Sequence, residues 1–243
     1  MTHSKTDIRA LIFDWGGVLQ RTVDPSPRQA LERELGLSAG GVERAVFENP
    51  AWTKASLGLC SAEEAWSTIL KELGWPPQQG SDRCNDEDIA AFVQRFFAGD
   101  RLDPRLVAWI RGWRAEGYAV ALLSNAVPPL AIMTDDTGTS RQSEQRSDEL
   151  QPGRWGLPGL FDLQVFSYQL GVLKPDSRAY LAVLAKLDMP AANAVFVDDA
   201  LPNVLGAREV GLHALHFTGV TPLAADLARL GLSLPSSMGD ADT

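Results

Sequence analysis

Four short segments of the chain place polar side chains after apolar runs, in combinations suited to binding a phosphate and a metal ion. The first is the apolar run 8–13, which ends on Asp14 and is followed by Gly16 and Gly17. A carboxylate in this position is expected at the carboxyl edge of a parallel sheet, where open α/β sheets bind their ligands. Asp14 could serve there as a nucleophile or a metal ligand, and the glycines would let a ligand approach the backbone amides.

The next two segments carry groups that complement a carboxylate. Ser124 and Asn125 end a second apolar run and offer a hydroxyl and an amide suited to phosphate oxygens. Lys174 offers a compact positive charge, which suits both a carboxylate nucleophile and a transferring phosphoryl group.

The last segment ends in two adjacent acids, Asp198 and Asp199, after the apolar run 194–197. Neighbouring carboxylates at the edge of a buried strand repel each other unless a cation or a lysine compensates them. Together with Asp14 they offer the hard oxygen ligands that Mg²⁺ prefers. The sequence therefore predicts a magnesium site, and the alternative for this pair is two solvated loop acids.

These segments need a fold that brings the ends of separate strands to one edge. Strand-like runs alternate with helical patterns, which is typical of a mostly parallel sheet with right-handed crossovers. We predict an α/β fold with a Rossmann-like parallel sheet and helices on both faces. The expected strands are 8–14, 118–124, 163–167, 194–198 and 212–217, and the expected helices are 104–116, 177–187 and 203–210.

Residues 20–100 differ in character, because their periodicity is helical almost throughout and contains no strand-like run. Apolar residues line one side of the expected helices 61–73 and 85–97, and residues 61–64 have the pattern of a capping box. An all-helical insertion directly after the first strand predicts a cap domain over that strand's end. Helices packed against the flank of the sheet are the alternative.

The predicted organisation is an α/β core made of residues 1–19 and 101–233, with the helical cap 20–100 inserted. Residues 135–153 are polar and lack periodicity and aromatic side chains, so we expect a mobile loop there. Residues 234–243 are expected to form a disordered tail.

Composition narrows the class of function further. The 243 residues are 45% hydrophobic and 22% charged, which is typical of a globular protein, and the net charge of −9 argues against nucleic-acid and anionic-membrane partners. The two cysteines, Cys60 and Cys84, lack metal-ligand spacing and are expected to be reduced thiols. Without a signal-peptide core or an apolar run approaching a membrane span, we expect a cytoplasmic location.

With these residues in this order, the chain resembles the haloacid dehalogenase superfamily of aspartate-nucleophile hydrolases over essentially its whole length. Residues 13–19 look like the first motif, Ser124 and Asn125 like the second, residues 174–176 like the third, and residues 197–199 with Asn203 like the fourth. The insertion 20–100 is similar to the cap of the subgroup that includes phosphoglycolate phosphatases and haloacid dehalogenases.

The resemblance implies a catalytic role for Asp14, which would attack phosphorus and form an aspartyl-phosphate, and for Lys174 beside it. The substrate would be a small phosphorylated metabolite and the cofactor Mg²⁺. The residues implied for the phosphoryl group are Ser124, Asn125 and Lys174, with Asn125 shaping the site. The ligands implied for the metal are Asp14, the backbone carbonyl of Gly16, Asp198 and Asp199.

The chain departs from the family pattern at Gly16, where most phosphatases of this superfamily carry a second aspartate. That aspartate protonates the leaving oxygen and then activates water, help that is typically worth about 10²–10⁴-fold. We therefore expect a phosphatase whose substrate has a good leaving group, such as a sugar 1-phosphate or an acyl phosphate, or one that takes its acid from the cap. Glucose-1-phosphatase-like members are similar in carrying glycine at this place.

Two other functions remain open from the sequence. A metal-independent 2-haloacid dehalogenase needs no acid to expel a halide, and Arg21 could match the arginine of those enzymes, although the pair Asp198 and Asp199 fits a magnesium site better. A non-catalytic phosphate-binding or regulatory protein would tolerate Gly16, but it would have no need of an intact Asp14.

Overall fold

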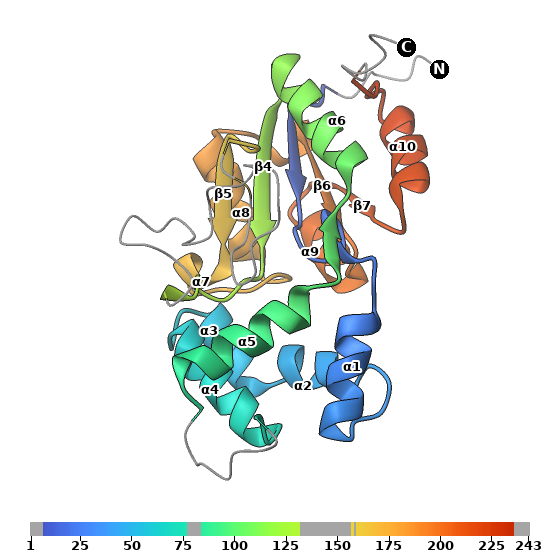
Figure 1. Ribbon diagram of the computed structural model, residues 1–243. Coiled ribbons are helices and arrows are strands. Elements are labelled where there is room, and N and C mark those ends of the chain that lie inside the picture. Colours follow the sequence, from blue (N-terminus) through green and yellow to red (C-terminus); the bar gives the residue numbers. More distant parts are fainter. Residues whose placement is uncertain (1–6, 77–83, 132–156, 158, 236–243) are drawn as a thin grey trace, which may run out of the picture. The chain divides into compact units, whose positions relative to one another are not determined.

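The chain divides into two compact units, an α/β unit and a helical unit. The α/β unit consists of Met1–Arg21, Leu102–Asn125 and Gly156–Thr243, and the helical unit of Thr22–Arg101 and Ala126–Trp155. The computed structural model describes residues 7–76, 84–131, 157 and 159–235 (Figure 1). The predicted loop 135–153 and residues 236–243 of the predicted tail lie outside the described residues.

A five-stranded parallel sheet forms the centre of the α/β unit. Its strands follow the order β5 (Leu163–Phe166), β4 (Ala119–Ser124), β1 (Ala10–Phe13), β6 (Ala194–Asp198) and β7 (His213–His216). All four residues of the central strand β1 are buried, as a strand covered on both faces requires. Each strand falls within a predicted range, and the predicted fold class is confirmed.

Helices cover both faces of this sheet (Figure 1). On one face, Tyr180 of α8 (Ser177–Leu187) and Val204 of α9 (Leu201–Glu209) share a hydrophobic core with Ile12 of β1. Phe13 points to the opposite face, because side chains alternate along a strand. There it stacks on Trp113 of α6 (Pro104–Ala115), with 6.2 Å between the ring centroids. The remaining helices of this unit are α7 (Ser167–Leu170), the 3₁₀ helix Ala191–Asn193 and α10 (Val220–Arg229).

Side-chain caps mark the starts of α6 and α8. The Asp103 carboxylate accepts a hydrogen bond from the Arg105 amide at the start of α6, and the Asp176 carboxylate accepts one from the Arg178 amide at the start of α8. The prediction of a start at residue 203 for α9 is wrong by two residues, because the helix begins at Leu201. Proline in the first turn removes an N–H that would have no partner within the helix, so Pro202 does not delay the start.

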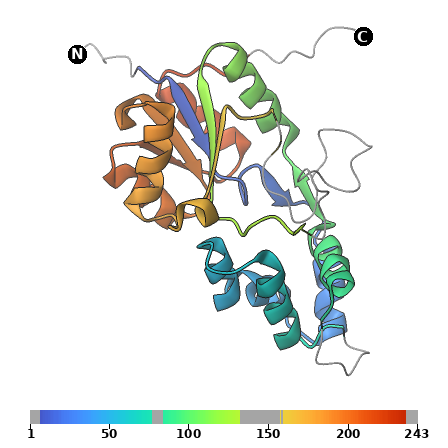
Figure 2. The same cartoon turned by 90° about the vertical axis from the view of Figure 1, so that its left-hand side faces the viewer.

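The helical unit has a hydrophobic core of its own. Its described helices are α1 (Ser26–Leu35), α2 (Gly41–Phe47), α3 (Pro50–Ser56), α4 (Ala62–Glu72) and α5 (Asp86–Phe97). Helix α1 packs beside α5 (Figure 2). Trp66 lies in the centre of the core, with its ring centroid 5.4 Å from that of Trp52 and 5.9 Å from that of Phe92.

Two features differ from the prediction for residues 20–100 and their surroundings. Short strands β2 (Gln20–Thr22) and β3 (Asp100–Leu102) form a two-stranded sheet, although no strand was expected within residues 20–100. Three residues are too few to show an alternating pattern. Val127 and Leu130, expected in the α/β core, belong to the core of the helical unit.

The ends of the described chain also contribute to the fold. Pro235, expected in the tail, packs against α6 so closely that a Cβ at Gly112 would lie 2.3 Å from the Pro235 Cβ. The indole N–H of Trp113 donates to the carbonyl of Ser233 at 3.1 Å. Among the described helices, none has the length and apolar character needed to cross a bilayer.

Arg28 lies in a buried polar cluster of the helical unit. Its guanidinium donates to both carboxylate oxygens of Asp100 at 3.1 Å and to the carbonyl of Phe96 at 3.1 Å. The guanidinium carbon lies 4.3 Å from the centroid of the Phe96 ring. The side chains of Arg28 and Asp100 are only 9% and 5% exposed, so their charges depend on protein partners, chiefly each other, rather than on water.

We expect Arg28→Met to lower the free energy of unfolding by about 3–5 kcal/mol, because the buried carboxylate of Asp100 would lose its guanidinium. As a control, Glu34→Ala breaks the partly exposed pair of Glu34 with Arg95 and should cost about 0–1 kcal/mol. Urea denaturation followed by tryptophan fluorescence measures both. Equal losses for the two variants would contradict the assignment of Arg28 to a buried ion pair.

Candidate active site

The predicted site residues of three neighbouring strands meet at one edge of the sheet. Strand β1 lies between β4 and β6, with Phe13 opposite Leu122 on one side and Val197 on the other. The amide of Asp14 donates to the carbonyl of Val197 at 2.9 Å, which continues the pairing past the end of β1. Since parallel strands end at the same edge, Asp14, Ser124 and Asp198 are positioned there by the register alone.

Lys174 connects two of the carboxylates at this edge. Its Nζ lies 2.7 Å from Asp14 Oδ1 and 2.7 Å from Asp198 Oδ2. The side chains of Lys174 and Asp198 are 1% and 0% exposed. Burial alone would lower the pKa of Lys174, but the charges of Asp14 and Asp198 outweigh it and hold that pKa above its ordinary value. The lysine is therefore a fixed positive charge between two buried acids.

The acids of the site share a strongly negative environment. Burial raises the pKa of Asp14 to about 6, the charge of Asp198 adds to this rise, and the ammonium of Lys174 opposes it. The pKa of Asp199 is also raised, first by burial and then by the charge of Asp198. Both shifts indicate that the site needs more positive charge than Lys174 supplies.

Asn203 and a backbone amide fix the orientation of Asp198. The Asn203 amide nitrogen donates to both carboxylate oxygens of Asp198, at 3.0 and 3.1 Å, and the Ala200 amide donates to Oδ1 at 2.8 Å. The Tyr180 hydroxyl of α8 in turn donates to the Asn203 carbonyl at 2.7 Å. The sequence places Asn203 in the fourth motif but predicts no function for it. Its place in the first turn of α9 lets its side chain reach back to the strand end.

Asn125 holds the segment that carries Lys174. Its amide nitrogen donates to the Lys174 carbonyl at 3.0 Å, and its amide oxygen accepts from the Lys174 N–H at 2.9 Å. Helix α9 supports the same segment from the other side, where a Cβ at Gly206 would lie 2.7 Å from the Pro175 carbonyl oxygen. These contacts favour the shaping role expected for Asn125 over direct contact with phosphate.

Asp14, Asp198 and Asp199 form a donor set that fits a hard divalent cation. Their carboxylates offer oxygen atoms that all lie within 4.8 Å of one another. Three carboxylates against one ammonium leave an excess of two negative charges, which one divalent ion would neutralise. The set contains only oxygen, and oxygen ligands suit Mg²⁺.

The loop after β1 turns tightly on itself and places two glycines in different environments. The amides of Leu19 and Gln20 both donate to the Trp15 carbonyl at 2.9 Å, and the Gly17 amide donates to the Gln20 carbonyl at 2.9 Å. Gly17 has a φ of 76°, and a Cβ there would lie 2.1 Å from Asp199 Oδ2. Gly16 lies outside the left-handed range, and apart from its own residue and its two chain neighbours no heavy atom of the described chain lies within 4 Å of its Cβ position.

Arg21 contacts Asp103 and Phe217 rather than a carboxylate of the cluster. Its guanidinium pairs with Asp103, the residue that caps α6, and lies 5.6 Å from the ring centroid of Phe217. Through these contacts Arg21 joins β2 to Asp103 and Phe217 of the α/β unit. They offer no support for the match to the arginine of haloacid dehalogenases.

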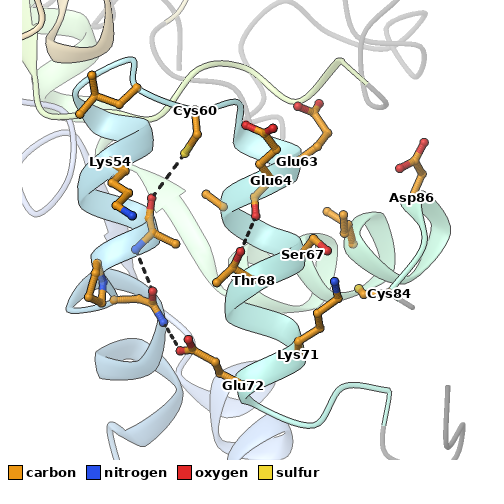
Figure 3. Close-up of a pocket in the computed structure, with 16 residues that line it drawn as sticks. Lys54, Cys60, Glu63, Glu64, Ser67, Thr68, Lys71, Glu72, Cys84 and Asp86 are labelled. Atoms are coloured by element: carbon orange, nitrogen blue, oxygen red, sulfur yellow. Dashed lines mark hydrogen bonds between the residues drawn. The ribbon is translucent and has the colours of Figure 1, made fainter. Parts of the chain in front are cut away.

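A groove of about 940 Å³ lies wholly within the helical unit (Figure 3). Helices α3 and α4 and the start of α5 line it with charges of both signs, among them Lys54 and Glu72. Both cysteines face it and are free thiols. Burial, and then a nearby carboxylate, raises the pKa of Cys60 and raises that of Cys84 to about 11, so neither is a reactive thiolate near neutral pH.

In sequence, the chain matches known hydrolases. Residues 8–211 match the family described as haloacid dehalogenase-like hydrolase. Sesquiterpene phosphatase astK of Aspergillus oryzae is 28% identical over 225 residues, which are 93% of this chain and 97% of that protein. The match to this relative therefore spans the helical unit as well as the α/β unit.

In fold, the chain is similar to solved bacterial structures. A predicted HAD-like family hydrolase from Porphyromonas gingivalis matches with a TM-score of 0.64 and 22% identity, over 92% of this chain and 98% of that one. The HAD family enzyme bt-2542 from Bacteroides thetaiotaomicron, solved in complex with magnesium and inorganic phosphate, matches with a TM-score of 0.60 and 19% identity, over 86% and 93% of the two chains. At such identities the likeness concerns the fold.

The two glycines after Asp14 should respond oppositely to alanine. Gly17→Ala should lower the free energy of unfolding by more than about 1 kcal/mol, because alanine resists the left-handed conformation and its Cβ would overlap the Asp199 carboxylate. Gly16→Ala adds the same methyl group in open space and should change stability by less than about 0.5 kcal/mol. Chemical denaturation of both variants is the measurement. Comparable losses would show that the loop geometry is wrong.

Proposed function

The chain belongs to the haloacid dehalogenase-like hydrolases, and we propose that it is a magnesium-dependent phosphatase that works through an aspartyl-phosphate on Asp14. The match over residues 8–211 confirms the family predicted from the four motifs. The observation that carries the proposal is the double ion pair of Lys174 with Asp14 and Asp198 at one edge of the sheet. It keeps a carboxylate buried, oriented and next to a fixed positive charge, as a nucleophile for phosphoryl transfer requires.

Each residue of the cluster has a proposed task. Asp14 attacks phosphorus, and Lys174 orients the attacking carboxylate and attracts the phosphoryl oxygens. The Ser124 hydroxyl, at the end of β4, binds another of these oxygens. Asp14, Asp198 and Asp199, with the Gly16 carbonyl, would hold Mg²⁺. When bound, the ion neutralises charge on the phosphoryl group.

The proposed substrate class is a phosphorylated isoprenoid. Support comes from the sesquiterpene phosphatase of Aspergillus oryzae, whose similarity extends over nearly all of both chains. Because that match includes the helical unit, it covers the part of the chain that we expect to select the organic group.

The other two functions considered from the sequence have less support. A haloacid dehalogenase would need an arginine near its nucleophile, and Arg21 is paired with Asp103. A protein that only binds phosphate has no need of a nucleophile tied to a buried lysine, as Asp14 is to Lys174.

We expect Asp14→Asn to reduce phosphate release from p-nitrophenyl phosphate by more than about 10³-fold, because the amide cannot act as the nucleophile. The same replacement at Asp226, a partly exposed residue of α10 outside the proposed site, should leave the rate unchanged. Removing divalent ions with EDTA should stop the wild-type reaction, and added Mg²⁺ should restore it. Undiminished activity in Asp14→Asn, or in EDTA, would contradict the proposal.

A further inference from the structure

We infer that the protein removes the terminal phosphate of an isoprenoid diphosphate and leaves an isoprenoid monophosphate as its product. This inference rests on the proposed function and adds the kind of bond that is broken. It starts from the position of Gly16 beside the proposed nucleophile Asp14.

No carboxylic acid of the described α/β unit is available to protonate a leaving group in place of a residue-16 side chain. Beyond Gly16 and its two chain neighbours, no described heavy atom lies within 4 Å of the Gly16 Cβ position. Asp198 is held by Lys174, Asn203 and the Ala200 amide. Asp199 lies against Gly17, but its carboxylate belongs to the proposed metal set and serves there as an anion.

On this inference the leaving group departs without a proton, and an acid supplied by the helical unit would contradict it. An isoprenoid alcohol has neither an aryl nor an anomeric oxygen, so its monophosphate can only expel an alkoxide, which needs an acid. A diphosphate attacked at its terminal phosphorus expels a phosphate monoester instead. The second pKa of such a monoester is about 6, so it leaves as a stable anion at neutral pH. Of the isoprenoid monophosphate and diphosphate, the diphosphate is the one whose leaving group needs no acid at position 16.

The bonds and charges balance without an additional reactant. An Asp14 carboxylate oxygen forms a bond to the terminal phosphorus, and the bond from that phosphorus to the bridging oxygen breaks. The electron pair goes to the bridging oxygen, which becomes part of the monophosphate. Water then attacks the phosphorus of the aspartyl-phosphate, and the products are the Asp14 carboxylate and inorganic phosphate, which carries the protons of that water.

Gly16 has a second consequence, because an aspartate at this position would also activate the water. A good leaving group removes the need for the acid in the first step, but it does nothing for the water in the second. Hydrolysis of the aspartyl-phosphate therefore limits turnover of the diphosphate. The first turnover should be fast and the later ones slow, which gives a burst of monophosphate equal to the enzyme present.

The test compares farnesyl diphosphate with farnesyl monophosphate, each with Mg²⁺, by rapid quench and phosphorus NMR. We expect the diphosphate to be cleaved at least about 10²-fold faster, which is the lower bound for the help of a general acid. The diphosphate should give a burst of farnesyl monophosphate, and the monophosphate should give no burst.

Variants at position 16 separate the chemistry from the shape of the site. Gly16→Asp should raise the rate on farnesyl monophosphate by at least about 10-fold, because it restores an acid in open space. Gly16→Asn has the same size without the acid and should give no such gain. If either variant fails to fold, the wild-type comparison of the two substrates still decides.

The possible outcomes separate this inference from the proposed function. Wild-type cleavage of the monophosphate as fast as the diphosphate overturns the inference and leaves the phosphatase proposal in place. Hydrolysis of p-nitrophenyl phosphate without turnover of either farnesyl compound also overturns it. Failure on all three substrates overturns the phosphatase proposal itself.

Discussion

Two buried carboxylates can lie at the same sheet edge in this protein only because the ammonium of Lys174 lies between them. Asp14 and Asp198 follow adjacent strands, so the register of β1 and β6 fixes how close they come. Like charges at such a distance repel, and burial adds the cost of removing each from water. Contacts of 2.7 Å from one lysine to both acids compensate that repulsion. The proposed nucleophile, the proposed metal ligands and the lysine proposed to bind phosphate are thus parts of one electrostatic unit.

Several residues outside the proposed chemistry exist to keep that lysine and its partners in place. Asn125 bonds the Lys174 backbone in both directions, and Gly206 lets α9 approach the segment that follows. Asn203 holds both oxygens of Asp198 and is itself anchored by Tyr180. These hydrogen bonds and close contacts therefore fix the geometry of the site, which is the condition for electrostatic preorganisation. Gly16 is the exception, since the position of its missing side chain is open.

Much of this could be predicted from the sequence, because apolar runs that end in polar residues mark the ends of buried parallel strands. That pattern predicted the five strands, and with them the meeting of Asp14, Ser124 and Asp198 at one edge of the sheet. Features that depend on three-dimensional partners could not be predicted. A single sequence does not reveal that both polar atoms of the Asn125 side chain bond to the backbone of Lys174. Nor does it reveal that Asp199 crowds the Cβ position of Gly17, while that of Gly16 meets no atom beyond its chain neighbours. Strands as short as β2 and β3 carry too few residues for a pattern.

The most direct test of the central claim is to locate the phosphate on the protein during turnover. Wild-type protein is mixed with p-nitrophenyl phosphate and Mg²⁺, quenched in acid, digested and fragmented in a mass spectrometer. If Lys174 holds Asp14 as the nucleophile, the peptide that contains Asp14 carries a phosphate on that residue, and the corresponding peptide of Asp14→Asn carries none. A phosphate found on Asp198 or Asp199 instead, or turnover with no phosphorylated peptide in the wild type, would contradict the account.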